Sequence, residues 1–203
     1  MVSRREKETE FKKQLIAEAA FQLFSQTWYE NVTVEEIARK AEFGKGTIYK
    51  YFASKEEIIA YIMCQGIDEI CVRIEEQCLS EPNLMKALSN YISLQYHFYM
   101  AYHHIFLSLM RRAIDGTANS QWFTEINGRH EKKTNMVAEI LNRGMTEKYI
   151  AEADAFKMAR VLEKVIKGFT IEAQREKGTD VEKDLELIKA VLSHGILLNK
   201  GGE

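Results

Sequence analysis

The sequence predicts an all-α protein, and three observations support this fold class. The chain of 203 residues has a single proline, Pro82, and 11 glycines, so residues that interrupt helices are rare. Apolar residues recur at intervals of three and four over most of the chain, which is the spacing of one face of a helix. No segment alternates apolar and polar residues as a half-buried strand would.

Turn residues divide the helical pattern into two domains, which we place at residues 1–54 and 55–203. The first is a small three-helix domain that follows a few frayed residues. The second contains longer helices, with Gly144 in a turn. Hydrophobic residues make up 46% of the whole chain, which is enough to bury a sizeable core. Helices are expected at residues 11–25, 34–41, 45–52, 54–80, 84–101, 102–114, 120–142, 154–175 and 181–198.

The small domain carries a basic patch, although the net charge of the whole chain is −2. Residues 39–55 contain five lysines and arginines and one acidic residue, Glu42, which is a local excess of four positive charges. A local patch matters more for binding phosphates than the charge of the whole chain does. The first domain is therefore the expected site of contact with nucleic acid.

Capping boxes and a turn organise the three short helices. Thr33-Val-Glu-Glu36 and Ser54-Lys-Glu-Glu57 each have a hydroxyl residue followed three positions later by glutamate, the pattern of a helix start. Residues 42–44 form a tight turn between the second and third helices. Three short helices with such a turn predict a helix-turn-helix motif.

The third helix has two different faces. At about 100° per residue, Ile48 and Phe52 fall on one side and can pack on the first two helices. The other side presents Gly46, Thr47, Tyr49 and Lys50. Hydroxyls, a cation and small residues suit a helix that reads a DNA groove. For an isolated helix, the alternative is that such a face is simply exposed to solvent. The context of three short helices favours a DNA-binding face instead.

Four stretches of the first domain resemble the DNA-binding domain of the TetR family of regulators. They are Leu15-Ile-Ala-Glu-Ala-Ala-Phe-Gln-Leu-Phe24, Val32-Thr-Val-Glu-Glu-Ile-Ala-Arg-Lys-Ala41, Lys45-Gly-Thr-Ile-Tyr-Lys-Tyr-Phe52 and Ser54-Lys-Glu-Glu57. The resemblance covers residues 11–62. It implies a ligand-responsive, homodimeric repressor that leaves double-stranded operator DNA when a small molecule binds.

The resemblance also implies which residues meet DNA. Thr33 and Lys55, in the first turns of their helices, would hold the phosphate backbone. Two positions depart from the family pattern, because Trp28 stands where glycine is usual and Gly44 where a small hydroxyl residue is usual. The expected DNA-binding residues are Thr33, Gly44, Lys45, Gly46, Thr47, Tyr49, Lys50, Tyr51 and Lys55.

The last two helices resemble the dimer-forming helices of the same family, which would make a four-helix bundle across a two-fold axis. Gly168 in mid-helix costs about 1 kcal/mol relative to alanine, and close approach of a helix would explain it. The helix that approaches Gly168 would belong either to a second copy of the chain or to the same subunit. The expected interface residues are Val161, Val165, Gly168, Phe169, Leu187, Val191, His194 and Leu198.

An aromatic-rich region lies between these two parts, and the resemblance favours an effector pocket there. A pocket needs apolar walls with a few polar groups, although aromatic residues at helical spacing also fill ordinary cores. We expect a largely apolar or aromatic effector, such as a fatty acyl compound. The candidate lining residues are Tyr91, Tyr96, Tyr99, Tyr102, His103, Phe106, Met110, Trp122 and Phe123.

Catalysis, metals and membranes are not indicated. The histidines lack a metal-binding spacing, and we expect no catalytic residue, no metal and no cofactor. Cys64, Cys71 and Cys78 lie seven residues apart on one helix face and are expected core residues, with a thiol redox sensor as an alternative. No apolar run approaches the about 20 residues that span a bilayer, and a charged N-terminus indicates a cytoplasmic protein without a membrane partner.

Two other functions remain open on the sequence. The chain could be a small-molecule-binding or enzymatic helical protein with a vestigial helix-turn-helix. It could also be a regulator whose ligand promotes DNA binding, because the sequence does not determine the sign of the response. Effector and operator are not identified by these patterns.

Overall fold

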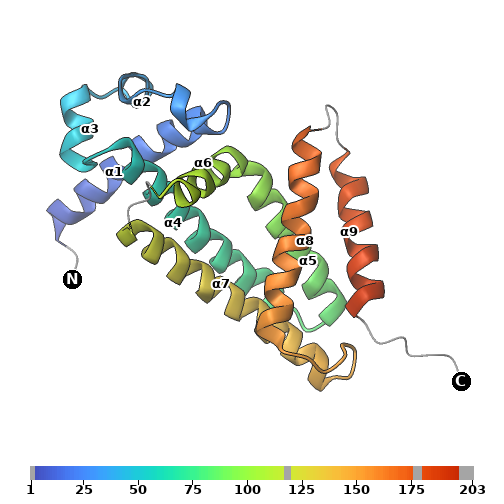
Figure 1. Cartoon of the computed structure of the whole chain (residues 1–203). Coiled ribbons are helices and arrows are strands. Elements are labelled where there is room, and N and C mark those ends of the chain that lie inside the picture. Colours follow the sequence, from blue (N-terminus) through green and yellow to red (C-terminus); the bar gives the residue numbers. More distant parts are fainter. Residues whose placement is uncertain (1–2, 117–119, 176–179, 197–203) are drawn as a thin grey trace, which may run out of the picture. The chain divides into compact units, whose positions relative to one another are not determined.

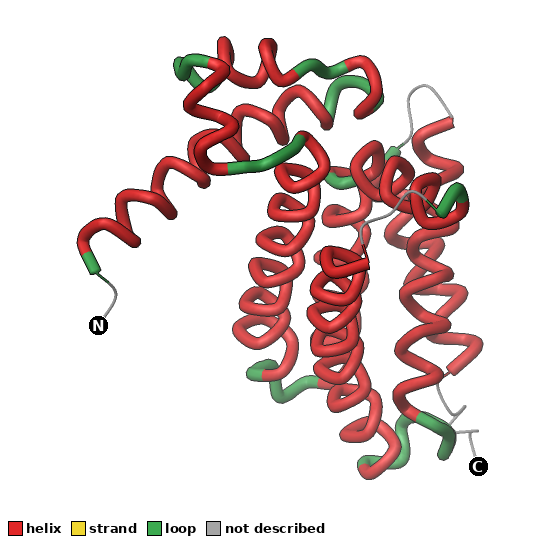
Figure 2. Tube along the Cα trace, turned by 60° about the vertical axis from the view of Figure 1, so that its left-hand side comes forward, coloured by secondary structure: helices red, strands yellow, loops and turns green. Residues whose placement is uncertain are grey.

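The computed structural model describes residues 3–116, 120–175 and 180–196, and only the backbone at residues 120 and 193–196. Every element in these ranges is helical, as Figure 2 shows. The chain forms two compact units. Unit 1 comprises Met1–Gly66 and Tyr102–Asn127, and unit 2 comprises Ile67–Ala101 and Gly128–Glu203. The unit with the helix-turn-helix thus extends beyond residue 54, the predicted domain boundary, and includes a later part of the chain.

Unit 1 contains the three predicted short helices, the whole of α6 and parts of two other later helices (Figure 1). Its elements are α1 (Arg4–Phe24), the 3-10 turn η1 (Tyr29–Asn31), α2 (Val34–Lys40), α3 (Lys45–Tyr51), the first part of α4 (Lys55–Ile74), α6 (His103–Ile114) and the first part of α7 (Ser120–Thr146). The core of the helix-turn-helix consists of fully buried apolar side chains from successive helices. They are Ile16, Ala20, Phe24, Ile37, Ile48, Phe52 and Ile58.

Helix α1 begins seven residues earlier than predicted, so the chain is helical from Arg4 and not frayed there, while residues 1–2 lie outside the described residues. Ser3 caps the helix, since its Oγ accepts a hydrogen bond of 3.2 Å from the Glu6 amide. The Glu6 carboxylate accepts one of 2.7 Å from the Ser3 amide. This reciprocal capping box satisfies two amides at the helix start and compensates for a first turn without apolar residues.

Unit 2 contains the end of α4, a π-helical turn η2 (Glu75–Leu79), α5 (Leu84–Ala101), the rest of α7, α8 (Ala155–Arg175) and α9 (Val181–Ile196). Helices α8 and α9 lie side by side in Figure 1. The predicted helix over residues 54–80 ends its regular part at Ile74, and α5 has the predicted bounds. A continuous apolar core joins α5, α7, α8 and α9. None of the helices in the described ranges is long and apolar enough to cross a bilayer.

Gly144 lies within α7 and not in a turn, contrary to the prediction. A Cβ at this position would lie 2.6 Å from Cδ1 of Ile150 and 2.9 Å from Cδ2 of Leu84. The side chains of Ile150 and Leu84 therefore approach the backbone of α7 so closely that they would have to shift to admit a methyl group. Sequence reasoning assigned this glycine to a helix stop, whereas packing explains it.

We expect Gly144→Ala to lower the free energy of unfolding by about 1–3 kcal/mol, because the new methyl group overpacks the contact with Ile150. Gly128→Ala in the same helix is the control, since no atom lies within 4 Å of its Cβ position. Removing that glycine should raise the free energy of unfolding by about 1 kcal/mol. Urea unfolding of both variants checks this pair, and effects of the same sign would contradict the packing explanation.

Candidate nucleic-acid interface

Helix α3 is buried on one side and exposed on the other, as its sequence predicts. Ile48 and Phe52 are each 1% exposed, and they fix the rotation of the helix. Tyr49 is 48% exposed. Its neighbours on the solvent side, Gly44, Lys45, Gly46 and Lys50, are also exposed, while Thr47 and Tyr51 are half-buried. The predicted groove-reading side chains therefore share one accessible surface, which we call the α3 face.

The turn before α3 obtains its shape from an unexpected residue. Glu42 has φ 60°, a left-handed conformation that normally favours glycine. Gly44 has φ −71° and ψ 149° and serves as the N-cap of α3 without a side-chain hydrogen bond. No atom lies within 4 Å of a Cβ built at Gly44 or Gly46. Packing within the described chain thus requires neither glycine, and both leave open space over the α3 face.

The start of α2 has a capping box of its own and an ion pair to α3. Thr33 forms the predicted capping box, because its Oγ1 accepts from the Glu36 amide at 3.2 Å and its own amide donates to Glu36 Oε2 at 2.8 Å. Lys45 forms an ion pair with Glu35. Both partners of this pair are more than half exposed, so water and salt screen it and the lysine can exchange partners at little cost.

The second predicted capping box is only half formed. The Glu57 amide donates to Ser54 Oγ at 3.2 Å, as expected. The Glu57 carboxylate accepts from the amide of Ala53, at 2.6 Å, and not from that of Ser54. The start of α4 is therefore tied to the segment that follows α3.

Lys55 has internal partners in this structure. Its ammonium donates to the carbonyl oxygens of Tyr29, at 2.7 Å, and Val32, at 2.6 Å. It also lies 4.0 Å from the centroid of the Tyr29 ring. Burial lowers the pKa of this lysine. Lys55 thus stabilises the turn between α1 and α2, whereas sequence reasoning assigned it to the DNA backbone.

Sequence reasoning missed a polar cluster around Tyr29, which links η1, α4 and α6 within unit 1. The Tyr29 hydroxyl donates to Glu56, and Arg112 of α6 donates to the same Glu56 oxygen at 3.0 Å. The Arg112 guanidinium stacks 4.6 Å from the ring centroid, so the ring lies close to two cations. We call Tyr29, Lys55, Glu56 and Arg112 the Tyr29 cluster. No sequence pattern indicates it, because Arg112 lies 56 residues from Glu56.

Electrostatic interactions in the Tyr29 cluster favour the ionised form of Glu56 and the neutral form of Tyr29. Burial acts to raise the pKa of Glu56, but hydrogen bonds from Tyr29 and the charge of Arg112 hold it below its ordinary value. Burial, followed by the bond to Glu56, raises the pKa of Tyr29. The cluster therefore keeps one carboxylate bound to a hydroxyl and a guanidinium at neutral pH.

The residues predicted to line an effector pocket are divided between the two units. Tyr91, Tyr96 and Tyr99 belong to unit 2 and are buried there. The Tyr96 hydroxyl donates to Asp184 of α9 at 2.7 Å, so it has a structural partner. The other candidates, Tyr102, His103, Phe106, Met110, Trp122 and Phe123, belong to unit 1.

Within unit 1, two of these candidates have clear surroundings. The Tyr102 ring stacks on Phe21 with centroids 4.9 Å apart. A Cβ at Gly66 would lie 2.3 Å from that ring, so Tyr102 packs directly on the backbone of α4. Met110 is 42% exposed.

Trp28 stands where the family pattern usually has glycine. Its backbone angles of φ −62° and ψ 141° are extended, so its position needs no glycine.

The predicted interface residues on α8 and α9 include an exposed apolar set. Val161 is 58% exposed, Leu187 53% and Val191 49%. Gly168 is exposed, and no atom lies within 4 Å of its Cβ position, so no helix of the described chain explains it. Val165 and Phe169 are half-buried. The side chain of His194, and Leu198 altogether, lie outside the described residues.

The three cysteines are buried, as predicted. Burial raises the pKa of Cys71, and it raises that of Cys78 to about 11. Since the thiolate is the reactive form, burial and a raised pKa disfavour these two residues as redox sensors. In the described ranges, no group of three or more His, Cys, Asp or Glu side chains could hold a metal ion.

Taken together, a helix-turn-helix whose third helix exposes basic and hydroxyl-bearing side chains is typical of DNA-binding proteins. Residues 16–62 match the family described as "Bacterial regulatory proteins, tetR family". This part of the chain is thus similar in sequence to the DNA-binding domain of the TetR family. The matched segment contains α2, α3 and Lys55.

Curated relatives and solved structures agree with this assignment. The chain is 38% identical over 73 residues to the HTH-type transcriptional regulator YhgD of Bacillus subtilis, across 36% of this chain and 37% of YhgD. It is 25% identical over 134 residues to the transcriptional repressor KstR2 of Mycobacterium tuberculosis, across 66% of each chain. The chain thus covers less than two thirds of either relative.

The fold extends over nearly the whole chain. A transcriptional regulator from Saccharomonospora viridis, solved in complex with choline, superposes with a TM-score of 0.80 at 19% identity. This match covers 92% of the present chain and 98% of the other. At this identity the match establishes the architecture, including the helices that follow the DNA-binding motif.

We expect Lys55→Met and Lys50→Met to separate stability from DNA binding. Lys55→Met removes two hydrogen bonds to carbonyls. It should lower the free energy of unfolding by about 1–2 kcal/mol, a range that allows for the weakening of these bonds by the partial exposure of Lys55. Lys50→Met on the α3 face should change it by less than about 0.5 kcal/mol. It should instead lower the salt dependence of DNA binding by about one ion per subunit.

Urea unfolding and fluorescence anisotropy with duplex DNA at several salt concentrations measure the two effects. If Lys55→Met lowered the salt dependence as much as Lys50→Met does, the ammonium would exchange its carbonyl partners for a phosphate. The sequence-based assignment of Lys55 would then hold for the DNA-bound state.

Proposed function

We propose that this protein is a ligand-responsive transcriptional repressor that binds operator DNA as a homodimer and leaves it when a small molecule occupies its helical domain. The observation that carries the proposal is the α3 face, where buried Ile48 and Phe52 force Tyr49 and Lys50 into solvent. This arrangement matches a recognition helix that enters the major groove. Operator binding implies a cytoplasmic location.

The residues of the α3 face divide into two roles. Lys45 and Lys50 supply cations for phosphates, which gives affinity without sequence preference. Thr47 and Tyr49 offer hydroxyl groups and an aromatic edge for base edges, which gives selectivity. Gly44, Gly46 and Tyr51 complete the surface, and the open space at both glycines lets the sugar-phosphate backbone approach closely.

The Tyr29 cluster supports a route from an effector to the α3 face. Arg112 is on α6, the helix that also carries His103, Phe106 and Met110 of the predicted effector region. Its partner Glu56 is in the first turn of α4, next to Lys55, which holds the turn before α2. An effector that prefers a shifted α6 would therefore alter the support of the helix-turn-helix. Coupling of this kind is typically about 1–3 kcal/mol.

The exposed apolar set on α8 and α9 supports dimerisation. Val161, Leu187 and Val191 are each about half exposed, which is unusual for three large apolar side chains on two adjacent helices. Open space beside Gly168 would admit a helix of a second copy. A two-fold dimer would place two recognition helices about 34–36 Å apart, one turn of DNA.

Two alternatives differ in what they predict. A regulator whose ligand promotes DNA binding would have the same α3 face and the opposite ligand response. A small-molecule-binding protein with a vestigial helix-turn-helix would bind no DNA selectively. The exposed cations of the α3 face favour DNA binding, because a vestigial surface has no need to keep them.

We expect the full-length protein to bind its operator, selected from a random DNA pool, more tightly than scrambled DNA, and to release it when a suitable apolar probe is added. Anisotropy titrations with and without decanoate, 2-decanone and 2-acetylnaphthalene measure this release. Arg112→Met should weaken operator binding in the absence of any probe and reduce the further loss that a probe causes, since it removes the ion pair to Glu56 that supports the helix-turn-helix. Operator affinity that no probe changes would argue against release, and tighter binding would support the co-repressor alternative.

We expect Gly168→Ala to weaken the dimer by about tenfold or more, because a methyl group overpacks a close helix contact by about 1–3 kcal/mol. The control is Gly128→Ala, whose Cβ position is equally open within the chain. It should leave the dimer unchanged. Sedimentation equilibrium gives both dissociation constants, and an unchanged constant for Gly168→Ala would place the interface elsewhere.

A further inference from the structure

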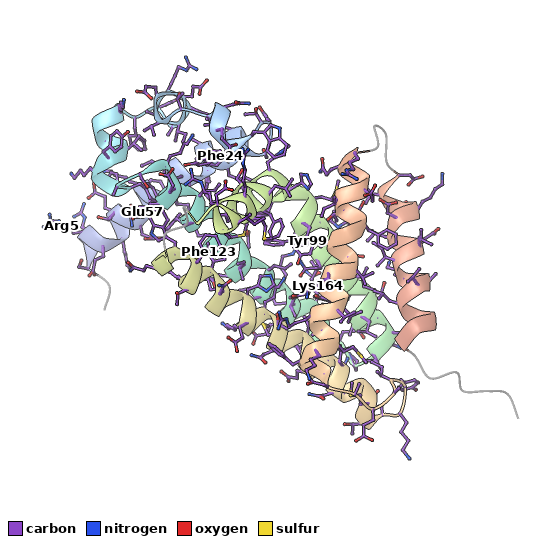
Figure 3. The ribbon with its side chains drawn as sticks, in the orientation of Figure 1. Arg5, Phe24, Glu57, Tyr99, Phe123 and Lys164 are labelled. Atoms are coloured by element: carbon purple, nitrogen blue, oxygen red, sulfur yellow. The ribbon has the colours of Figure 1, made fainter. Side chains whose placement is uncertain are left out.

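The core of unit 2 contains an ion pair inside an apolar helical bundle. Lys133 of α7 is fully buried, and Glu163 of α8 is 5% exposed. Gln95 of α5 is also fully buried and lies beside them. Figure 3 labels Tyr99, which belongs to the same part of α5. Charged side chains are rarely fully buried unless they are paired or serve a purpose.

Most polar atoms of this ion pair lie close to a charged or hydrogen-bonding partner. The Lys133 ammonium donates to Gln95 Oε1 at 2.7 Å. It lies 3.1 Å from Glu163 Oε1, outside hydrogen-bond geometry, so that pairing is chiefly electrostatic. Thr134 donates weakly to Glu163 Oε2 at 3.5 Å, and His130 Nδ1 lies 3.7 Å from the same oxygen. The ammonium is also 5.6 Å from the ring centroids of Phe98 and Tyr99.

Two buried donors of α5 have no partner within the described part of the chain. They are the Tyr91 hydroxyl and the Gln95 side-chain amide nitrogen. Tyr91 and Gln95 are both fully buried, and they lie about 40° apart around the helix, on one face. Tyr91 is close enough to Glu163 for the carboxylate to contribute to its raised pKa, after burial itself. Native proteins rarely leave two such donors unsatisfied on one face of a buried helix.

The charges of the cluster restrict what could satisfy these donors. Lys133 and Glu163 balance one another. Burial, assisted by Lys133, lowers the pKa of His130 and keeps its ring neutral at neutral pH. An ionic ligand would therefore add an unbalanced buried charge. A quaternary ammonium would also find the faces of Phe98 and Tyr99 already occupied by the Lys133 ammonium.

We propose that unit 2 binds an uncharged, largely apolar molecule through a carbonyl oxygen that accepts hydrogen bonds from the Tyr91 hydroxyl and the Gln95 amide. Phe98 and Tyr99 would contact its apolar body. The side chain of His130 is 38% exposed, so solvent reaches the edge of the cluster. This inference rests on the proposed function, since it specifies the chemistry of the effector, and its test uses binding without DNA.

The test measures binding of three probes to the full chain by isothermal titration calorimetry. 2-Decanone presents a carbonyl, decanoate a carboxylate and decyltrimethylammonium a cation on chains of similar length. 2-Acetylnaphthalene provides a ketone of another shape. At least one ketone should bind in the micromolar range, and both ionic probes should bind about tenfold more weakly or worse.

Tyr91→Phe tests the hydroxyl directly. It should weaken ketone binding by about three- to tenfold, the effect of one hydrogen bond. It should also raise the thermal unfolding midpoint of the free protein, since it removes an unsatisfied buried hydroxyl. A purely structural tyrosine would not combine these opposite changes.

The matched control is Tyr96→Phe on the same helix, about 140° away from Tyr91. Tyr96 was a predicted lining residue, but its hydroxyl is bound to Asp184 and it takes no part in the site proposed here. The Tyr96 hydroxyl already donates to Asp184, so its loss should lower the unfolding midpoint. Ketone affinity should remain that of the unmodified protein. The two phenylalanine variants thus remove the same group from a satisfied and an unsatisfied environment.

Three results would overturn the inference: no binding of either ketone, ionic probes that bind as well as ketones, or Tyr91→Phe with unchanged ketone affinity. The calorimetric experiment contains no DNA. If ketones bind in a Tyr91-dependent manner but do not change the affinity for the operator, only the proposed release is contradicted. Release of the operator by decanoate, with ketones inactive, would count against this inference only.

Discussion

The burial of Ile48 and Phe52 is the constraint on which the DNA-binding surface depends. Both side chains are almost completely inaccessible, and they fix the rotation of a helix of only seven residues. Once that rotation is fixed, Tyr49 and Lys50 can only face solvent. A helix this short gains little stability from its own hydrogen bonds, so its position comes from packing on α1 and α2.

The Tyr29 cluster gives the helix-turn-helix a second kind of support, in which charge and aromatic stacking replace apolar burial. Lys55 uses its ammonium on two carbonyls of the turn, while Arg112 and Tyr29 share one carboxylate oxygen of Glu56. These groups come from three separate elements of unit 1. Movement of α6 would therefore disturb ion pairs directly, whereas a purely apolar contact would adapt by repacking.

Unit 2 departs from the usual distribution of polar and apolar residues in two places. Its core holds Lys133, Glu163 and two unsatisfied donors, and its surface exposes Val161, Leu187 and Val191. Each departure costs stability in an isolated subunit. Under the proposed function, binding of a ligand and of a second subunit would offset these costs.

The sequence by itself determined the all-α class, the bounds of α5, the capping box of Thr33 and the two faces of α3, because helix periodicity and caps are local properties. It also indicated a DNA-binding domain similar to that of the TetR family, because the motif is contiguous along the chain, and residues 16–62 match that family. Only the tertiary structure decided the roles of Lys55, Gly144, Tyr29 and Lys133. Lys55, Tyr29 and Lys133 form hydrogen bonds with partners 23 to 38 residues away. Gly144 is constrained by Leu84 of α5 and by Ile150 beyond the end of α7. No local pattern encodes these contacts. The left-handed Glu42 and the open Gly44 show the same limit, since which residue bends a turn depends on how the flanking helices pack.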